Sequence, residues 1–422
     1  MQLEKPKLFP DKKSFIWAMG IIFFLLLLRL GVTYHAYLEF VSKPFYYTYA
    51  NVLTAYEKTK HERTYTVLKL KSEEGFTFYT TTHLKKAFKH KRLRLQIFPN
   101  ESIRFQDYLG IFYVKSKLKE EKEQELSYKD GLLKTIAIQH QNNDLKQFYQ
   151  AIFFATPLSK QVREKITLLG VSHLVALSGF HLGILWAVLY GILLALYRPI
   201  QQTFFPYRYA LLDVGFVVML LLGLYVWFVD FPPSLVRSYA MVLVAWIVIL
   251  LGLELLSFGF LTMVGLMLVT LFNSLLVSLS FWFSMIGVFY IFLLLTYSKA
   301  MSQKSISFFV IPFGIFILML PVVHTIFGTT SSYQLLSPLL SVVFIVFYPL
   351  MIGLHLVGMG EMFDENVLWL FSLPSTQKES FLPLWSMLVY GGLSIGAIWH
   401  KTIFYILLGV ALLYAIYLFV FV

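Results

Sequence analysis

Long apolar runs separated by short polar breaks cover most of this chain, and this pattern predicts membrane-crossing helices. About 20 residues cross the hydrocarbon core of a bilayer as a helix. The first apolar run, at residues 15–28, follows four lysines. Nine more runs follow residue 167. We therefore expect about ten transmembrane helices, the last nine near residues 168–197, 209–229, 235–253, 257–273, 276–297, 306–327, 335–357, 383–399 and 402–421.

The basic flank of the first run predicts the orientation of the chain. Lys and Arg are enriched in cytoplasmic loops, so the N-terminus is expected in the cytoplasm and the next segment outside it. No small-x-small cleavage site follows the run, which favours an uncleaved signal anchor. Two later loops then fall inside as the rule requires, and they carry Arg198, Arg208, Lys299 and Lys304. The loop at 360–380 also falls inside by this count, although it is acidic.

Residues 35–167 follow a different pattern. Apolar and polar residues alternate at 65–71, 76–81, 92–98 and 103–114, with Gly and Pro in the breaks. Alternation with a period of two is typical of strands with one buried face. We expect a small sheet or barrel of about five strands, followed by a charged linker with amphipathic helices. The predicted divisions of the chain are 1–34, 35–115, 116–167 and 168–422.

Composition supports this division and suggests a partner. Hydrophobic residues make up 58% of the chain and charged residues 14%, against about 25% charged in an average soluble domain. Residues 35–167 carry 23 basic and 14 acidic side chains, whereas residues 168–422 carry seven of each. A basic soluble domain favours an anionic partner, either nucleic acid or anionic lipid.

Several classes of chemistry lack their usual sequence signals. The chain has no cysteine, which excludes disulfides, thiolate metal sites and a cysteine nucleophile. It has no glycine-rich phosphate loop ending in Lys-Ser/Thr, so no ATPase is expected. The ten histidines are scattered rather than clustered. We therefore expect no metal, no cofactor and no enzymatic activity.

Residues 170–183, Gly-Val-Ser-His-Leu-Val-Ala-Leu-Ser-Gly-Phe-His-Leu-Gly, place polar groups in a segment that enters the membrane. Ionisable groups at membrane depth are costly and usually face a cavity or one another. On one continuous helix His173 and His181 would lie roughly 80° apart. Ser178 and Gly179 can instead break the helix and expose backbone groups. The simpler alternative is close helix packing through small residues.

A second polar stretch, Asp-Phe-Pro-Pro-Ser-Leu-Val-Arg-Ser at 230–238, opens the fourth predicted span. Arg237 there lies about one helical turn deep. Its planar guanidinium is well shaped for a phosphate. The alternatives are an ion pair with Asp230 or snorkelling to lipid headgroups. A third stretch, at 273–284, contains Phe281, Trp282 and Ser284. The rings of Phe281 and Trp282 also suit a membrane interface.

The run at 85–94 interleaves basic and aromatic residues beside predicted strands. Proteins that bind single-stranded nucleic acid combine backbone-tracking cations with aromatic rings that stack on bases. The alternative is a solvated basic loop. The candidate nucleic-acid contacts are Lys85, Lys86, Lys89, Lys91, Arg92 and Arg94, with Phe76, Phe78 and Tyr79 as candidate stacking rings.

These stretches resemble the ComEC family of competence DNA channels. Ser-His-Leu-Val-Ala-Leu-Ser-Gly-Phe-His-Leu-Gly at 172–183 is similar to that family's HL-x-A-[IVL]-SG-L-HV-G signature, with Phe180 in place of Leu. Pro-Ser-Leu-Val-Arg-Ser at 233–238 is similar to PS-x-x-RA, with Ser238 in place of Ala. Leu-Ser-Phe-Trp-Phe-Ser at 279–284 is similar to the GF-x-LS helix, although Ser274 stands where Pro is common. The resemblance covers about 148–297, and more weakly 35–115.

The resemblance implies a polytopic α-helical membrane protein with an N-terminal, periplasmic, oligonucleotide-binding (OB)-like β-barrel domain. It implies a channel for single-stranded DNA across the bacterial cytoplasmic membrane during natural transformation. The expected partners are single-stranded DNA, membrane lipid, a periplasmic DNA receptor, a cytoplasmic translocation motor and a second copy of the chain. Many members end in a metallo-β-lactamase-like domain, which this sequence lacks. The residues expected along the DNA path are His173, Ser178, Gly179, His181, Ser234, Arg237, Phe281 and Ser284.

Three other functions stay open on the sequence. A small-molecule transporter would use helices broken at Ser178 and Gly179. A membrane-embedded enzyme acting on a polymer or lipid-linked substrate would use Asp230 or Glu254 as its base. A structural membrane anchor would leave the polar stretches without a function.

Overall fold

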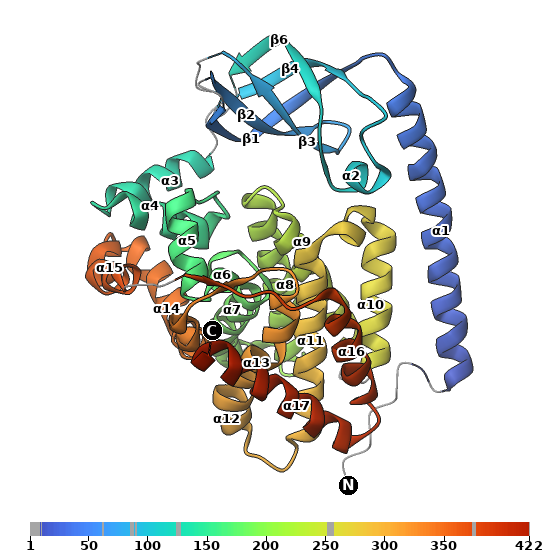
Figure 1. Cartoon of the computed structure of the whole chain (residues 1–422). Helices are drawn as coiled ribbons and strands as arrows, with labels where there is room; N and C mark the ends of the chain where they lie inside the picture. The colour runs from blue at the N-terminus through green and yellow to red at the C-terminus, as the bar shows by residue number, and fades with distance from the viewer. Residues whose placement is uncertain are drawn as a thin grey trace. The chain divides into compact units, whose positions relative to one another are not determined.

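The computed structural model describes residue 9 and residues 11–60, 63–84, 88, 91–123, 128–250, 257–373 and 377–421. The chain divides into two compact units (Figure 1). One unit contains Met1–Gly131 and Gly259–Trp282, and the other contains Leu132–Phe258 and Phe283–Val422.

The first unit begins with one long apolar helix and continues as a sheet. Helix α1, Lys12–Ser42, starts where the Asp11 carboxylate accepts a hydrogen bond from the Ser14 backbone N–H at 2.6 Å. A side chain that accepts from this position is a standard helix N-cap. The sheet elements are β1 Tyr46–Lys60, β2 Arg63–Ser72, β3 Thr77–Thr82, β4 Lys91–Phe98, α2 Phe105–Leu109, β5 Ile111–Tyr113 and β6 Lys115–Glu123.

The six strands lie in the order β5-β3-β2-β1-β4-β6. All neighbouring pairs are antiparallel except β3 and β5, which are parallel. Only Val114 separates β5 from β6, so one stretch of chain pairs first with β3 and then with β4. The alternating buried residues of the strands form the core, and Ala50, Leu70, Phe78, Leu93 and Ile97 are fully buried.

The sheet continues beyond the predicted boundary at residue 115. Residues 115–123, expected as charged linker, form strand β6. The reason is charge complementarity across strands, which stabilises a polar strand. Glu121 lies 3.5 Å from Lys91 and Glu120 lies 4.0 Å from Arg94, and both basic residues belong to β4.

The second unit is helical. Its amphipathic helices are α3 Tyr128–Ile138, α4 Asn143–Phe154, α5 Lys160–Leu168 and α6 Ser172–Val175. Its apolar helices are α7 Gly179–Phe204, α8 Ala210–Phe228, α9 Pro233–Leu250, α11 Leu279–Tyr297, α13 Ile311–His324, α14 Ser337–Leu356, α16 Leu384–Gly396 and α17 Lys401–Ile416. Between them lie α12 Gln303–Ser305, η2 Ile306–Val310, β7 Thr329–Thr330, η3 Ser332–Leu336, η4 Gly360–Phe363, α15 Asp364–Ser372 and β8 Lys378–Glu379, and η5 Tyr417–Phe421 follows α17.

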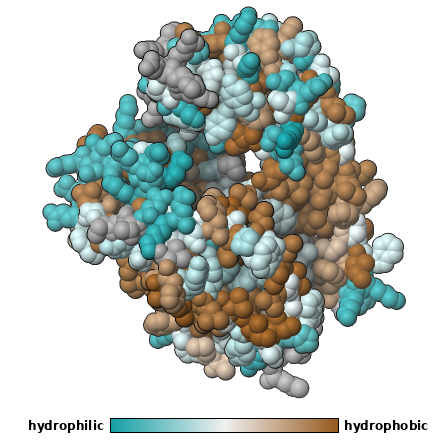
Figure 2. Space-filling view, in the orientation of Figure 1, coloured by the Kyte–Doolittle hydropathy of each residue, from teal (hydrophilic) through white to brown (hydrophobic). Residues whose placement is uncertain are grey.

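The remaining elements are α10, Phe258–Leu271, and η1, Asn273–Val277. An apolar helix lies near each of the ten predicted positions. Within the described residues, seven helices are long and apolar enough to cross a membrane. The helices in α9, α10 and α16 are shorter. The part of the chain that the structure describes therefore has about seven full spans where ten were expected, because an apolar run does not reveal how much of it is helical. Figure 2 shows apolar side chains over the surface of α1 and hydrophilic ones gathered over α3 and α4.

Helix α14 begins and ends beside the same amphipathic segment. Ser337 at its start donates a hydrogen bond to the Gly170 carbonyl at 2.9 Å. After its end, the Gly360 backbone N–H donates to Gln139 Oε1 at 2.9 Å. The start of α14 and the loop after its end therefore both contact the segment that contains α3–α6. These contacts favour a position of residues 360–380 on the side of α3–α6, whereas the count of spans predicts the cytoplasmic side.

Candidate functional site

A helix break places the polar groups of the first motif. Helix α6 ends at Val175 and α7 begins at Gly179, so of the two alternatives, one continuous helix or a break at Ser178 and Gly179, the structure has the break. Ser178 caps α7, with its Oγ accepting from the Phe180 N–H at 3.3 Å. In return, His181 Nδ1 accepts from the Ser178 backbone N–H at 3.3 Å. This reciprocal arrangement is a capping box, with histidine in the role usually taken by glutamate.

The cap fixes the tautomer of His181. Because Nδ1 accepts a hydrogen bond, Nε2 carries the proton of the neutral ring. His181 is 0% exposed, and Nε2 has no hydrogen-bond partner among the described residues. The ring instead meets Phe344 and Tyr348 of α14 edge to face, at centroid distances of 5.1 and 4.8 Å. The site therefore holds one buried N–H donor that is available to an acceptor.

His173 reaches the same helix from α6. Its Nε2 lies 3.2 Å from Ser341 Oγ of α14. Both histidines of the motif therefore contact α14, a helix in which the sequence showed only hydrophobicity. Sequence reasoning missed Ser341, Phe344 and Tyr348, because a serine and two aromatic residues in an apolar run carry no recognisable signal.

The second motif lies against the first. Arg237 and Ser238 of α9 are 5% and 4% exposed. Ser238 donates to the Ser234 carbonyl at 2.8 Å within the helix. A Cβ atom on Gly179 would lie 3.3 Å from Ser238 Oγ, so the glycine allows α7 and α9 to approach closely. Four of the predicted path residues, Ser178, Gly179, Ser234 and Arg237, therefore lie at the adjoining starts of α7 and α9.

The other proposed groups of the membrane part are Phe281, Ser284, Asp230 and Glu254. Phe281 belongs to the first compact unit, is fully buried and packs its ring against Trp282. Ser284 is half-buried on the same helix, α11. Asp230 is exposed and has a left-handed backbone, with φ 66°. Glu254 lies outside the described residues.

The sheet presents a surface of basic and aromatic residues on β1 and β4. The Arg92 guanidinium lies 4.8 Å from the centre of the Tyr49 ring. The Arg94 guanidinium lies 5.7 Å from Tyr49 and 5.8 Å from Tyr47. Carboxylates adjoin both arginines, Glu73 at Arg92 and Glu120 at Arg94. We call Tyr47, Tyr49, Arg92 and Arg94 the arginine–tyrosine surface.

The other predicted nucleic-acid contacts are not part of the arginine–tyrosine surface as defined. Lys85, Lys86 and Lys89 lie outside the described residues. Lys91 pairs with Glu121, and Tyr79 is half-buried on β3.

Two of the predicted stacking rings lie in or beside the core of the sheet. Phe78 is 0% exposed, and Phe76 packs on Phe40, Phe78 and Phe112. The expectation that Phe78 lies at the surface is therefore wrong, because alternation along β3 turns it inward. Tyr47 and Tyr49 were missed, since β1 was not among the predicted strands.

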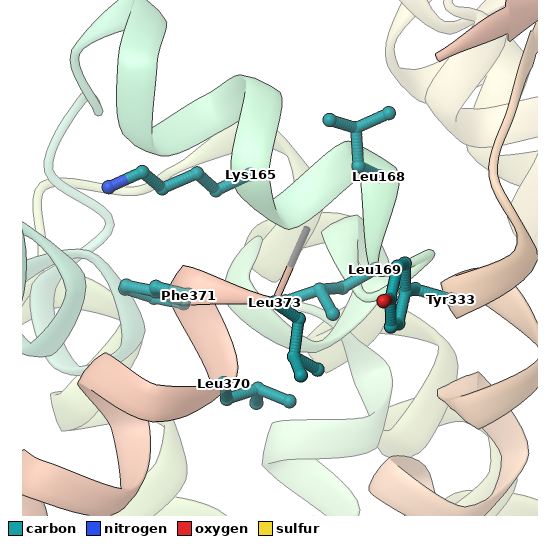
Figure 3. A pocket seen from close by; sticks show the side chains of 7 residues that line it. All are labelled: Lys165, Leu168, Leu169, Tyr333, Leu370, Phe371 and Leu373. Atoms are coloured by element: carbon teal, nitrogen blue, oxygen red, sulfur yellow. The ribbon is translucent and has the colours of Figure 1, made fainter. Parts of the chain in front are cut away.

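A small pocket lies between α5, η3 and the end of α15 (Figure 3). Its walls are Leu168, Leu169, Leu370, Phe371 and Leu373, with Tyr333 at one side. Its cation, Lys165, pairs with Asp144 at 2.8 Å. The polar groups that orient a ligand in a binding site do not converge in this lining. The pocket is therefore part of the packing between these elements.

Comparison with known proteins agrees with the motifs. The chain matches no curated protein and no solved structure. The model of one protein family, described as Competence protein, matches residues 155–419, a stretch that contains the polar groups of α7 and α9 and all of α14. Because this match covers more than half of the chain, the protein belongs to the Competence protein family.

Proposed function

We propose that this protein is a channel that passes single-stranded DNA across the bacterial cytoplasmic membrane during natural transformation. Membership of the Competence protein family supports a role in DNA uptake. The observation that carries the proposal is the meeting of two motifs inside a helical membrane protein. Arg237, Ser178 and the buried N–H of His181 gather where α7 and α9 begin. A strand of phosphates needs such groups, because hydrocarbon excludes it.

The sheet is proposed to capture the strand before passage. Its strand order and its parallel β3–β5 pair suit a five-stranded OB-like barrel in which residues 111–123 act as one strand. Alternating cations and rings on the arginine–tyrosine surface suit backbone contacts and base stacking. We place this domain on the periplasmic side, with the N-terminus in the cytoplasm. A periplasmic receptor would deliver DNA, and a cytoplasmic motor would pull it inward.

The channel carries out no bond chemistry in this proposal. The described residues contain no group of three His, Cys, Asp or Glu side chains placed to hold a metal ion. Degradation of the second strand during uptake would then belong to another protein.

Uptake of labelled DNA in a deletion strain tests the proposal. Cells that lack this protein should accumulate label outside the cytoplasmic membrane and show none in the cytosol, and the intact gene should restore entry. Normal entry of DNA in the deletion strain would reject the channel. A small-molecule transporter with an accessory domain would show normal DNA entry and loss of another substrate.

A further inference from the structure

Helix α14 seals the polar site. Phe344 and Tyr348 cover His181, and Ser341 contacts His173. Tyr348 is itself 0% exposed. No acceptor on a passing strand can reach His181 Nε2 while these side chains stay in place. The structure is therefore closed at this point, and α14 is the helix that has to move.

The C-terminal end of α14 is tied down by a chain of buried polar groups. His355 Nδ1 lies 2.7 Å from the Met351 carbonyl of the preceding turn. His355 Nε2 lies 2.9 Å from His140 Nε2. His140 Nδ1 lies 2.9 Å from both carboxylate oxygens of Asp364, at the start of α15. The chain joins the α3–α4 turn to α14 and α15.

The hydrogen bonds among Asp364, His140 and His355 need one proton more than two neutral imidazole rings and a carboxylate carry. The Met351 carbonyl is only an acceptor, so His355 Nδ1 carries a proton and His355 Nε2 accepts when that ring is neutral. His140 Nε2 must then donate to it. His140 Nδ1 faces an acidic carboxylate, so a further proton must lie between this nitrogen and Asp364. All of these hydrogen bonds form together only when His140 is an imidazolium beside the Asp364 carboxylate, or a neutral ring beside a protonated Asp364.

The surroundings of His140 isolate this pair. His140 is 2% exposed. Its titratable neighbours among the described residues are Asp364 on α15, His355 on α14 and Tyr149 on α4, whose ring stacks on His140 at 4.4 Å. Burial, with a smaller contribution from Asp364, raises the pKa of Tyr149, so this phenol stays neutral. Losing the proton would leave a ring nitrogen without hydrogen either beside the Asp364 carboxylate or facing the same kind of nitrogen across the contact of His140 with His355, and either arrangement breaks a buried hydrogen bond.

We propose that Asp364, His140 and His355 form a proton-dependent latch that holds α14 closed over His181. Release of the latch lets α14 move and admits the transported strand. The sealed site and the latch rest on geometry, and only the identity of the passing molecule rests on the proposed function. Loss of the shared proton breaks the chain of hydrogen bonds and favours opening.

The absence of cysteine allows a direct test. A single thiol introduced as Phe344→Cys lies on the sealed face of α14, and its maleimide labelling is followed in membranes without DNA. Asp364→Asn removes the carboxylate of the latch, and Glu365→Gln makes the same charge change at an exposed neighbouring position. We expect labelling to be at least about tenfold faster with Asp364→Asn, since charge-assisted hydrogen bonds are the stronger class. Glu365→Gln should leave the rate unchanged. Equal rates in the two backgrounds, at equal protein level, would overturn the latch.

A second measurement needs no change in the latch. In the protein with Phe344→Cys alone, labelling should accelerate as the pH rises, after correction with an exposed thiol at Ser372→Cys. A corrected rate that does not change with pH would also overturn the proposal. If the latch opens as expected in a protein that moves no DNA, the proposed function fails and the latch stands.

Discussion

Among single residues, His181 is notable because its two ring nitrogens have different surroundings. Nδ1 takes part in the cap of α7, whereas Nε2 is a buried donor without a hydrogen-bond partner in the described structure. A buried donor that finds no acceptor lowers stability. In the proposed function this donor acts during transport.

This division gives a prediction for His181→Leu. The substitution removes one accepted hydrogen bond and also removes the buried donor, so unfolding free energy should change by no more than about 1 kcal/mol. DNA entry should be lost. Thermal unfolding of the purified protein and a transformation assay measure the two effects. A large drop in stability together with lost entry would instead indicate a purely structural histidine.

At the scale of elements, glycines set how closely helices pack. A Cβ atom on Gly215 of α8 would lie 2.1 Å from the Trp246 ring of α9, whereas one on Gly191 of α7 would meet nothing within 4 Å. Gly215→Ala should lower the unfolding free energy by about 1–3 kcal/mol through overpacking. Gly191→Ala should be neutral or stabilising, because alanine favours helices. Thermal melts of both variants check this, and equal melting temperatures would contradict the described packing of α8 on α9.

The sheet gives a second prediction at this scale. In the full-length protein, replacing both Arg92 and Arg94 with Gln should weaken binding of single-stranded DNA without sequence preference. The salt dependence should fall by about 0.7 in log–log slope for each phosphate that the protein no longer neutralises. Replacing Tyr47 and Tyr49 with Ala should weaken binding by about 1–3 kcal/mol per stacked base and leave the slope nearly unchanged.

The exposed lysines Lys58 and Lys119 provide a matched control for this surface. Replacing this pair with Gln makes the same change in charge on the same sheet. If the lysine pair lowers affinity and slope as much as the arginine pair, the arginine–tyrosine surface has no special role and the domain binds through its net charge.

At the scale of the whole molecule, the path of α14 predicts the side of the loop that follows it. Thiols introduced as Ser372→Cys, after α14, and as Lys160→Cys, in α5, are both at exposed positions. A membrane-impermeant maleimide should label both in the same oriented membranes. Labelling of one position only would place them on opposite sides and would contradict the contacts of Gln139 and Ser337.

Periodicity and composition predicted the membrane class and the basic sheet, because positions that face lipid or the core favour apolar residues and positions that face water favour polar ones. The break at Ser178 and Gly179 was one of two alternatives from the sequence, because glycine and serine also occur inside unbroken spans, such as Gly191 in α7. The partners of His181 and the latch were not predictable, because Phe344, Tyr348, His355 and Asp364 lie more than 160 positions later in the chain. Contacts of that kind depend on tertiary packing, which local patterns do not encode. The number of full spans in the described residues was also not predictable, since the extent of helix within an apolar run depends on tertiary packing.

In the proposed channel, DNA passes the polar groups at the starts of α7 and α9, and the substitution Arg237→Lys probes this passage. Lysine keeps the charge but loses the planar, two-pronged geometry that suits a phosphate. Arg198→Lys, at an exposed position near the end of α7, is the matched control. In a deletion strain supplied with each variant, labelled DNA is measured separately at the cell surface and in the cytosol. We expect normal protein level and normal capture of DNA for both variants, with cytosolic entry lost only for Arg237→Lys. Normal entry with Arg237→Lys at normal protein level would contradict the proposed passage.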